Sequence, residues 1–264
     1  MSTSMPNINT TSAALKRRTT AINPIPAQRS PMNVPRVPTH CGTCNLREVC
    51  LPCGLPGSEF DLLDDLIYTR KSVKRGESLY RAGGAFDSLY AVRMGFFKSR
   101  VVLEDGRDQV TGFHMAGEIL GMDGIGTDSH NADVIALEDS EVCVIPYLHL
   151  QEPGLQRQLH KVMSRELVRD QGVMMLLGTM RAEERLAAFL LNLSQRFRAR
   201  GYSPSEFHLR MNRDEIGSYL GLSLETVSRL FSRFQDDELL LVQQKHIRIL
   251  DEDGLNGVMS REQA

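Results

Sequence analysis

The stretch Asn212–Phe234, NRDEIGSYLGLSLETVSRLFSRF, decides the fold of the C-terminal part of this 264-residue chain. Asn212 followed three residues later by Glu215 is a pattern that caps the start of a helix, and Gly221 supplies a turn after it. Ser223 predicts the start of a second helix. A short helix, a glycine turn and a second helix are typical of a helix-turn-helix.

The second of these helices has two different faces. Four apolar side chains recur at the spacing of one helix face and predict packing on the domain core; they are Val227, Leu230, Phe231 and Phe234. The opposite face carries Glu225, Ser228 and Arg229. Arg229 can donate two hydrogen bonds to guanine, Glu225 can accept one from cytosine, and Ser228 can bond a base or a phosphate. These residues predict a helix that reads double-stranded DNA; the alternative is an ordinary helical hairpin with a solvated polar face.

The residues after this helix predict a β-hairpin. Residues 239–242 and 246–250 are apolar and β-prone, and Gln243-Gln244-Lys245 separates them. A hairpin in this position is the wing of a winged helix-turn-helix, which we assign to residues 182–252. Residues 253–264 are expected to form a C-terminal tail.

Residues 59–152 are expected to form an antiparallel β-roll. Short β-prone segments such as Ser88–Val92 and Val134–Leu137 alternate with glycine-containing turns, among them Arg75-Gly76 and Ala82-Gly83-Gly84. Short strands at this spacing indicate an antiparallel sandwich or roll rather than alternating strands and helices. The fold class is therefore α+β.

Residues 153–181 predict one long dimerisation helix that runs from Leu155 to about Thr179. Residues at alternating steps of four and three form the seam of a coiled coil; they are Met163, Leu167, Asp170, Met174 and Leu177. The pattern predicts a homodimer, whereas the alternative is a single amphipathic helix lying on the β domain.

Asp170 occupies a seam position where an apolar residue is expected. In a parallel pair its two copies would face each other at about 5 Å, with a repulsion of at most ~3 kcal/mol. We expect Asp170 to act as a dimer switch, unless it turns to solvent or pairs with Arg169.

The N-terminal part combines a tail with a group of cysteines. Residues 1–39 are rich in proline, serine and threonine, which predicts a disordered tail. Residues 40–58 form a cysteine-rich arm with the spacing Cys41-x2-Cys44-x5-Cys50-x2-Cys53, and Cys143 stands alone in the β domain. Tight cysteine spacing without an export signal indicates a reducing, cytoplasmic setting and a metal site. The spacing fits zinc or an iron–sulfur cluster.

Composition excludes several classes of protein. The formal net charge is only −2, and no apolar run is long enough to span a membrane, so a membrane partner is not expected. The chain also lacks the glycine-rich motifs of dinucleotide and nucleotide binding. An enzyme is therefore not expected, and an iron–sulfur electron carrier would have no use for a DNA-reading helix.

Five segments, in this order, closely resemble the fumarate and nitrate reduction regulator (FNR) branch of the cyclic-AMP receptor protein (CRP) superfamily, over about residues 40–250. These segments are His40-Cys41-Gly-Thr-Cys44, Ser88-Leu-Tyr-Ala-Val92, Thr111-Gly-Phe-His114, Ala182-Glu-Glu-Arg-Leu-Ala-Ala-Phe189 and Tyr219-Leu-Gly-Leu-Ser-Leu-Glu-Thr-Val-Ser-Arg229. The resemblance implies an oxygen-responsive transcription regulator that binds a palindromic site with TTGAT-like half-sites as a dimer. It also implies contact with RNA polymerase, for which the turn at 104–108 is suggested.

The resemblance further implies an oxygen-labile 4Fe-4S cluster, held by three N-terminal cysteines and one distant cysteine. In this sequence they correspond to Cys41, Cys44, Cys50 and Cys143. Cys53 departs from the family pattern and is either a free thiol or an alternative ligand. The remaining alternative within the superfamily is a regulator with a structural zinc site or a small-molecule effector.

Cyclic AMP is the effector of other members of this superfamily. Gly117-Glu118 matches a pair in their nucleotide pocket, but residues 127–133 contain two aspartates and no arginine. A cyclic phosphate there would lack its charged partner. No cyclic nucleotide is therefore expected.

Overall fold

The computed structural model describes residues 40–55, 60, 63, 64, 69–103 and 105–260, apart from the side chain of residue 151. The predicted tail at 1–39 lies outside these residues. None of the described helices is both long and apolar enough to cross a membrane.

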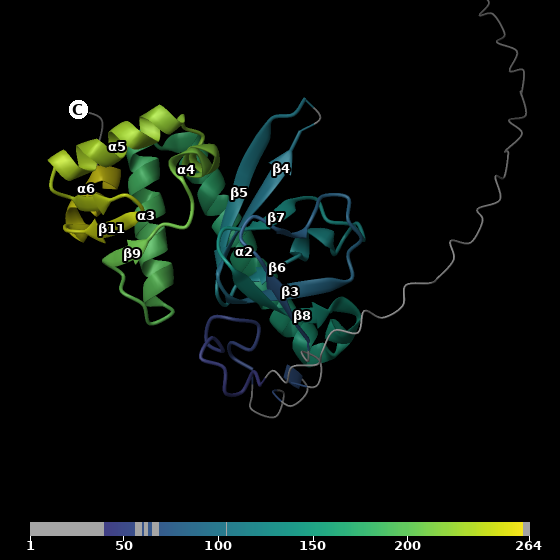
Figure 1. Cartoon of the computed structure of the whole chain (residues 1–264). Coiled ribbons are helices and arrows are strands. Elements are labelled where there is room, and N and C mark those ends of the chain that lie inside the picture. The colour runs from purple at the N-terminus through teal and green to yellow at the C-terminus, as the bar shows by residue number, and fades with distance from the viewer. Residues whose placement is uncertain (1–39, 56–59, 61–62, 65–68, 104, 261–264) are drawn as a thin grey trace, which may run out of the picture. The chain divides into compact units, whose positions relative to one another are not determined.

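The N-terminal domain is the predicted antiparallel β-roll, built from two four-stranded sheets (Figure 1). One sheet has the order β1 (Thr69–Val73), β8 (Ser140–Pro146), β3 (Ser88–Met94) and β6 (Ile119–Leu120). The other has the order β2 (Ser78–Tyr80), β7 (Asp133–Ala136), β4 (Phe96–Val102) and β5 (Asp108–Met115). Two short 3-10 helices, η2 (Met122–Gly124) and η3 (Tyr147–Gln151), complete the domain.

The core of the roll is built from buried apolar side chains of several strands. Leu89, Phe97, Val142 and Ile145 are completely buried, and they come from three strands in both sheets. Because successive strand residues point to opposite faces, Phe97 and Val142 lie in the core between the two sheets, whereas Leu89 and Ile145 face the arm and the start of α2. Strand β8 lies between β1 and β3, so residues on it are held on both sides.

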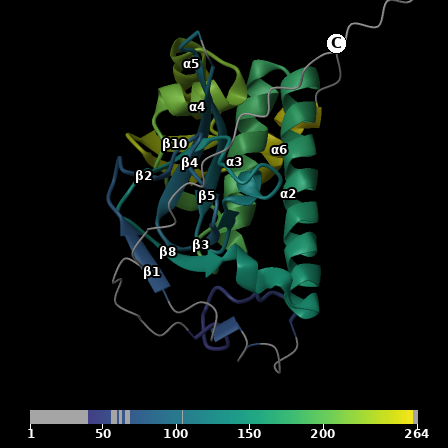
Figure 2. The ribbon, with the colours of Figure 1, turned by 90° about the vertical axis from the view of Figure 1, so that its right-hand side faces the viewer.

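The predicted long helix is α2 (Pro153–Thr179), shown in Figure 2 as one uninterrupted helix. Its first turns pack under the roll through buried Leu155, Leu159 and Val162. Beyond these residues an apolar stripe is exposed in the single chain, with Leu167 59% and Met174 63% exposed. This stripe is the predicted seam, and an exposed apolar stripe on a helix favours a protein partner.

The C-terminal domain is the predicted winged helix-turn-helix. It consists of α3 (Ala182–Arg198), β9 (Glu206–His208), α4 (Arg213–Leu220), α5 (Leu224–Asp236), β10 (Leu240–Gln243), β11 (His246–Ile249) and α6 (Glu252–Ser260). The wing pairs β10 with β11 within one residue of the predicted bounds, and β9 adds a third strand that the sequence did not suggest.

The expected C-terminal tail at 253–264 is wrong for residues 253–260. These residues belong to α6, whose Leu255 and Val258 are buried in the core of the domain. The helix is short and has two glycines, which weaken a helical pattern in the sequence. Its packing against α3 stabilises it instead.

Candidate functional site

The cysteine-rich arm lies against the β-roll as a series of turns. Backbone hydrogen bonds of 3.0 to 3.2 Å close these turns, including Cys44 N to the Cys41 carbonyl and Cys50 N to the Leu46 carbonyl. Leu46 and Leu51 anchor the arm, since they are 9% and 0% exposed. The cysteines therefore stand on a loop that apolar burial fixes at two points.

Four cysteines line one small cavity between the arm and the roll. Cys41, Cys44 and Cys50 come from the arm, and Cys143 comes from the middle of β8. Cys143 pairs in register with Ala91 of β3, which also lines the cavity. The structure thus brings together the four residues that the family resemblance indicated, although 92 residues separate the third from the fourth.

The fifth cysteine, Cys53, is not among the residues that line this cavity. It lines a separate groove along α2, where its carbonyl oxygen accepts a hydrogen bond from Gln158. Cys53 thus lines a different groove from the other four cysteines.

Burial makes three of these four thiols, those of Cys41, Cys50 and Cys143, poor acids in the absence of a cation. Burial, together with the neighbouring Cys143 and Cys44, raises the pKa of Cys50 to about 12. The pKa of Cys41 is raised by burial and by Cys50, and that of Cys143 is raised mainly by burial. Thiolates at these positions would repel one another, so a bound metal must supply the compensating positive charge.

The cysteines that line the cavity suit an iron–sulfur cluster, but the cavity itself is small. Four cysteine thiols are the ligand set of a 4Fe-4S cluster. The cavity measures about 30 Å³, which is room for one water molecule rather than a cluster. No three His, Cys, Asp or Glu side chains in the described part of the chain are placed to hold a single metal ion.

The predicted reading helix is formed as the sequence suggested. The hydroxyl of Ser223 caps α5 by accepting from Thr226 N at 3.2 Å, and Gly221 adopts the left-handed conformation with φ 65°. Val227 and Phe231 on the inner face are 0% and 3% exposed. This packing fixes the outer face of α5 toward solvent.

The three predicted DNA-contacting residues lie on that outer face. Glu225 and Arg229 are exposed, and Ser228 is half-buried. Arg229 Nη2 donates to the Thr226 hydroxyl at 3.4 Å, a weak contact that leaves most of its donors available. Short polar and charged side chains at this end of the second helix are the ones that reach base edges in a helix-turn-helix.

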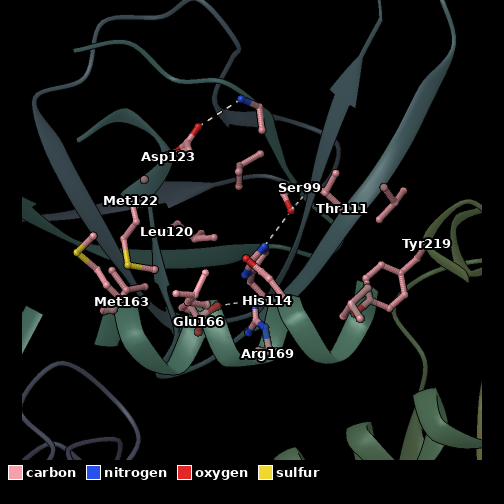
Figure 3. A pocket seen from close by; sticks show the side chains of 18 of the residues that line it. Ser99, Thr111, His114, Leu120, Met122, Asp123, Met163, Glu166, Arg169 and Tyr219 are labelled. Carbon is pink, nitrogen blue, oxygen red and sulfur yellow. Dashed lines mark hydrogen bonds and ion pairs between the residues drawn. The ribbon is translucent and has the colours of Figure 1, made fainter. Parts of the chain in front are cut away.

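A larger pocket of about 670 Å³ lies between the roll and α2 (Figure 3). His114 points into it beside Ser99, whose hydroxyl lies 3.0 Å from His114 Nε2. Burial, reinforced by the charge of Arg169, lowers the pKa of His114 to about 3, so the ring is neutral. Asp123 and Glu166 add acidic groups to the lining. The pocket therefore offers an anionic phosphate little positive charge besides Arg169.

Glu118 does not line this pocket, and its carboxylate binds arginines. Its carboxylate pairs with Arg200 at 2.7 Å, Arg196 at 2.8 Å and Arg169 at 3.4 Å. Burial alone would raise the pKa of Glu118, but the charges of Arg196, Arg169 and Arg200 outweigh it and lower the pKa to about 2. The Glu118 carboxylate thus links the roll to α2 through Arg169 and to α3 through Arg196.

This ionic cluster lies next to the cysteine arm. Val49, the neighbour of Cys50, packs so closely on Gly117 that a Cβ there would come within 2.6 Å of Val49 Cγ2. The arm and Glu118 are therefore connected through adjacent backbone. No pattern in the sequence indicates this cluster, because its arginines lie far from Glu118 along the chain and no spacing signals their approach.

Two family models match the chain. The cyclic nucleotide-binding domain matches residues 70–152, and the Crp-like helix-turn-helix domain matches residues 184–258. They coincide with the β-roll and with the winged helix-turn-helix of the structure.

Curated relatives are similar over most of their length. The transcriptional regulatory protein btr of Bordetella pertussis is 48% identical, and the alignment covers 84% of this chain and 94% of the relative. The transcriptional activator protein Anr of Pseudomonas protegens is 48% identical over 80% of this chain and 89% of the relative. The fumarate and nitrate reduction regulatory protein of Escherichia coli is 45% identical over 82% and 88%.

A solved structure shares the fold. FixK2 from Bradyrhizobium japonicum is 29% identical, with a TM-score of 0.67, over 74% of this chain and 98% of that chain. The chain thus combines a β-roll, a long helix and a winged helix-turn-helix. Its curated relatives are named as transcription regulators. The chain therefore belongs to the CRP/FNR family, a family of DNA-binding transcription regulators and not of enzymes.

Proposed function

We propose that this protein is an oxygen-responsive transcription regulator that binds a 4Fe-4S cluster through Cys41, Cys44, Cys50 and Cys143. The observation that carries the proposal is the shared cavity of these four thiols, which excludes Cys53. The name of one relative, fumarate and nitrate reduction regulatory protein, supports a role in anaerobic gene regulation.

The ligand positions suggest how the cluster would act on the protein. When bound, the cluster supplies positive charge to the four thiolates and is dismantled by oxygen. Cys143 lies on a strand paired on both sides, whereas the other three ligands lie on the arm. Coordination would therefore fix the arm to the roll, and loss of the cluster would release it.

Dimerisation is the step that we expect the cluster to control. Asp170 is exposed on the apolar stripe of α2. Its proposed alternative partner Arg169 instead pairs with Glu166 at 2.6 Å and with Glu118. Two copies of Asp170 facing each other would disfavour a parallel pair by at most ~3 kcal/mol. Fixing the arm against the start of α2 would offset this repulsion and favour the homodimer.

The dimer would place two copies of α5 on DNA. Two reading helices related by a two-fold axis match a palindromic site. We infer TTGAT-like half-sites, in which Arg229 reads guanine, Glu225 reads cytosine, and Ser228 bonds a base or a phosphate. For RNA polymerase we infer contact with the tip of the β4–β5 hairpin, where Asp105, Gly106 and Arg107 are exposed.

The second candidate is a family member with structural zinc or a small-molecule effector. Four thiols are also a ligand set for structural zinc, so the iron, sulfide and zinc assays described below distinguish the two metals. A cyclic nucleotide is disfavoured because Glu118 is bound by arginines and the pocket is acidic. An iron–sulfur electron carrier would leave the helix-turn-helix without a role.

Anaerobic purification tests the proposal. We expect iron and acid-labile sulfide in equal amounts, visible absorbance that bleaches when air is admitted, and a parallel loss of dimer and of DNA binding. Colourless protein with stoichiometric zinc and no sulfide would refute the iron–sulfur assignment. Retention of specific DNA binding after complete bleaching would refute the oxygen switch.

A further inference from the structure

The groove that contains Cys53 is separate from the cysteine cavity. It measures about 590 Å³ and is lined by Cys53 and by the first half of α2. Cys53 is partly buried and not in a disulfide. The thiol therefore borders a shallow groove that is open to solvent.

Three cations follow this groove on one face of α2. Arg157, Lys161 and Arg165 recur at intervals of four residues, so their side chains project to the same side of the helix. All three are exposed, and none forms an ion pair with another residue of the described chain. No acidic side chain lines the groove in the part of the chain that the structure describes. The groove therefore presents unneutralised positive charge beside a thiol.

A buried polar group in the same groove lacks a partner. Gln158 is 1% exposed, and its amide nitrogen donates to the Cys53 carbonyl. Because that acceptor is a carbonyl, the remaining amide atom must be the oxygen, and Oε1 has no hydrogen-bond partner among the described residues. A buried acceptor without a donor costs free energy, and a ligand N–H group that reaches Oε1 after a small rotation of the side chain would recover that cost.

We propose that Cys53 is a thiolation site that takes an anionic low-molecular-weight disulfide carrying amide N–H groups. The cations bind its carboxylates, and Gln158 Oε1 accepts from an amide. The Cys53 thiolate attacks one sulfur of the ligand, a bond forms between these sulfurs, and the ligand's own S–S bond breaks. The second half leaves as a thiolate that takes up a proton from water.

The site adjoins the cysteine cavity without lining it, because the Cys53 backbone N–H donates to the Cys50 carbonyl. Cys53 follows Cys50 by three residues, and its carbonyl oxygen accepts a hydrogen bond from Gln158 of α2. A bulky anionic adduct would occupy the groove between the arm and α2. This inference does not depend on the cluster, and its test requires neither iron nor DNA.

Oxidised glutathione and hydroxyethyl disulfide, which is neutral, are the two probes. The full-length protein, purified without oxygen, is treated with each, and the modified cysteine is identified by peptide mass spectrometry. We expect the glutathione adduct mainly on Cys53 and its loss in Cys53→Ala. The triple variant R157Q/K161Q/R165Q should react with oxidised glutathione on the order of tenfold more slowly, since a cationic cleft raises association rates by at least that factor. Its reaction with hydroxyethyl disulfide should stay unchanged.

Two controls decide the outcome. Arg248→Gln removes an exposed cation from β11 and should react like the parent. Glutamine keeps good helix propensity, and a circular dichroism spectrum like that of the parent verifies that α2 is intact in the triple variant. Equal slowing with both probes, or an unchanged glutathione rate, would overturn the cationic docking. Equal modification of Cys53→Ala would overturn the assignment to Cys53.

Discussion

Glu118→Gln removes the charge that joins the roll to α2 and α3. The carboxylate is only 10% exposed and has three arginine partners, so water cannot compensate for its loss. A glutamine of the same length can still accept hydrogen bonds, but it leaves Arg196 and Arg200 without their counter-charge. We expect the variant to unfold more easily and to lose the fixed contact between roll and reading domain.

The magnitude follows from the pKa of Glu118. The arginines lower it from the ordinary 4.5 to about 2, which at about 1.4 kcal/mol per tenfold change corresponds to about 3 kcal/mol of stability at neutral pH. Breaking a buried ion pair by removing one partner costs about 3 to 5 kcal/mol in other proteins. The two values agree in order of magnitude.

The pH dependence of the difference has a defined sign. A carboxyl group whose pKa is lowered by folding contributes stability above its unfolded value, and the contribution is lost as pH falls toward the folded value. The difference between parent and variant should be constant above pH 4.5. It should then shrink by about 1.4 kcal/mol per pH unit down to about pH 2.

Guanidinium unfolding at fixed protein concentration, at several pH values, measures this difference. Glu206→Gln is the matched control, because Glu206 is 47% exposed and its pairs with His246 and Arg248 should contribute less than about 1 kcal/mol. A loss in Glu118→Gln no larger than in this control would refute the reasoning. The reasoning would also be refuted if the difference in the free energy of unfolding between parent and Glu118→Gln were the same at pH 7 and at pH 3.5.

Three further substitutions test the proposed function. Cys143→Ala should lose most of the iron and sulfide of anaerobic protein while Cys53→Ala keeps them; equal contents in both variants would contradict the ligand assignment. Arg229→Ala should lose about 1 to 3 kcal/mol of discrimination at one G·C pair in quantitative DNA-binding assays, yet keep salt-sensitive non-specific binding. Full discrimination would show that Arg229 does not read a base. Asp170→Ala should dimerise without a cluster, where the parent is largely monomeric; sedimentation of both cluster-free proteins checks this, and a stable parent dimer would remove Asp170 from the switch.

The sequence by itself determined the architecture. Each element of the helix-turn-helix is set by local chemistry, since Asn212 and Ser223 cap their own helices and Gly221 adopts a left-handed turn. The apolar face of α5 follows from helical spacing alone, because positions three and four apart share a face whatever the rest of the chain does. The seam of α2 was predictable for the same reason.

Other features depended on contacts that no local pattern contains. Helix α6 has weak helix propensity and forms because α3 covers its apolar side chains. The resemblance suggested Cys143 as the distant ligand, but only the fold of the roll places β8 against the arm and leaves Cys53 in another groove. Glu118 and its arginines meet only after three separate elements pack together. Their burial then produces the low pKa, because charges interact strongly only where folding has excluded water.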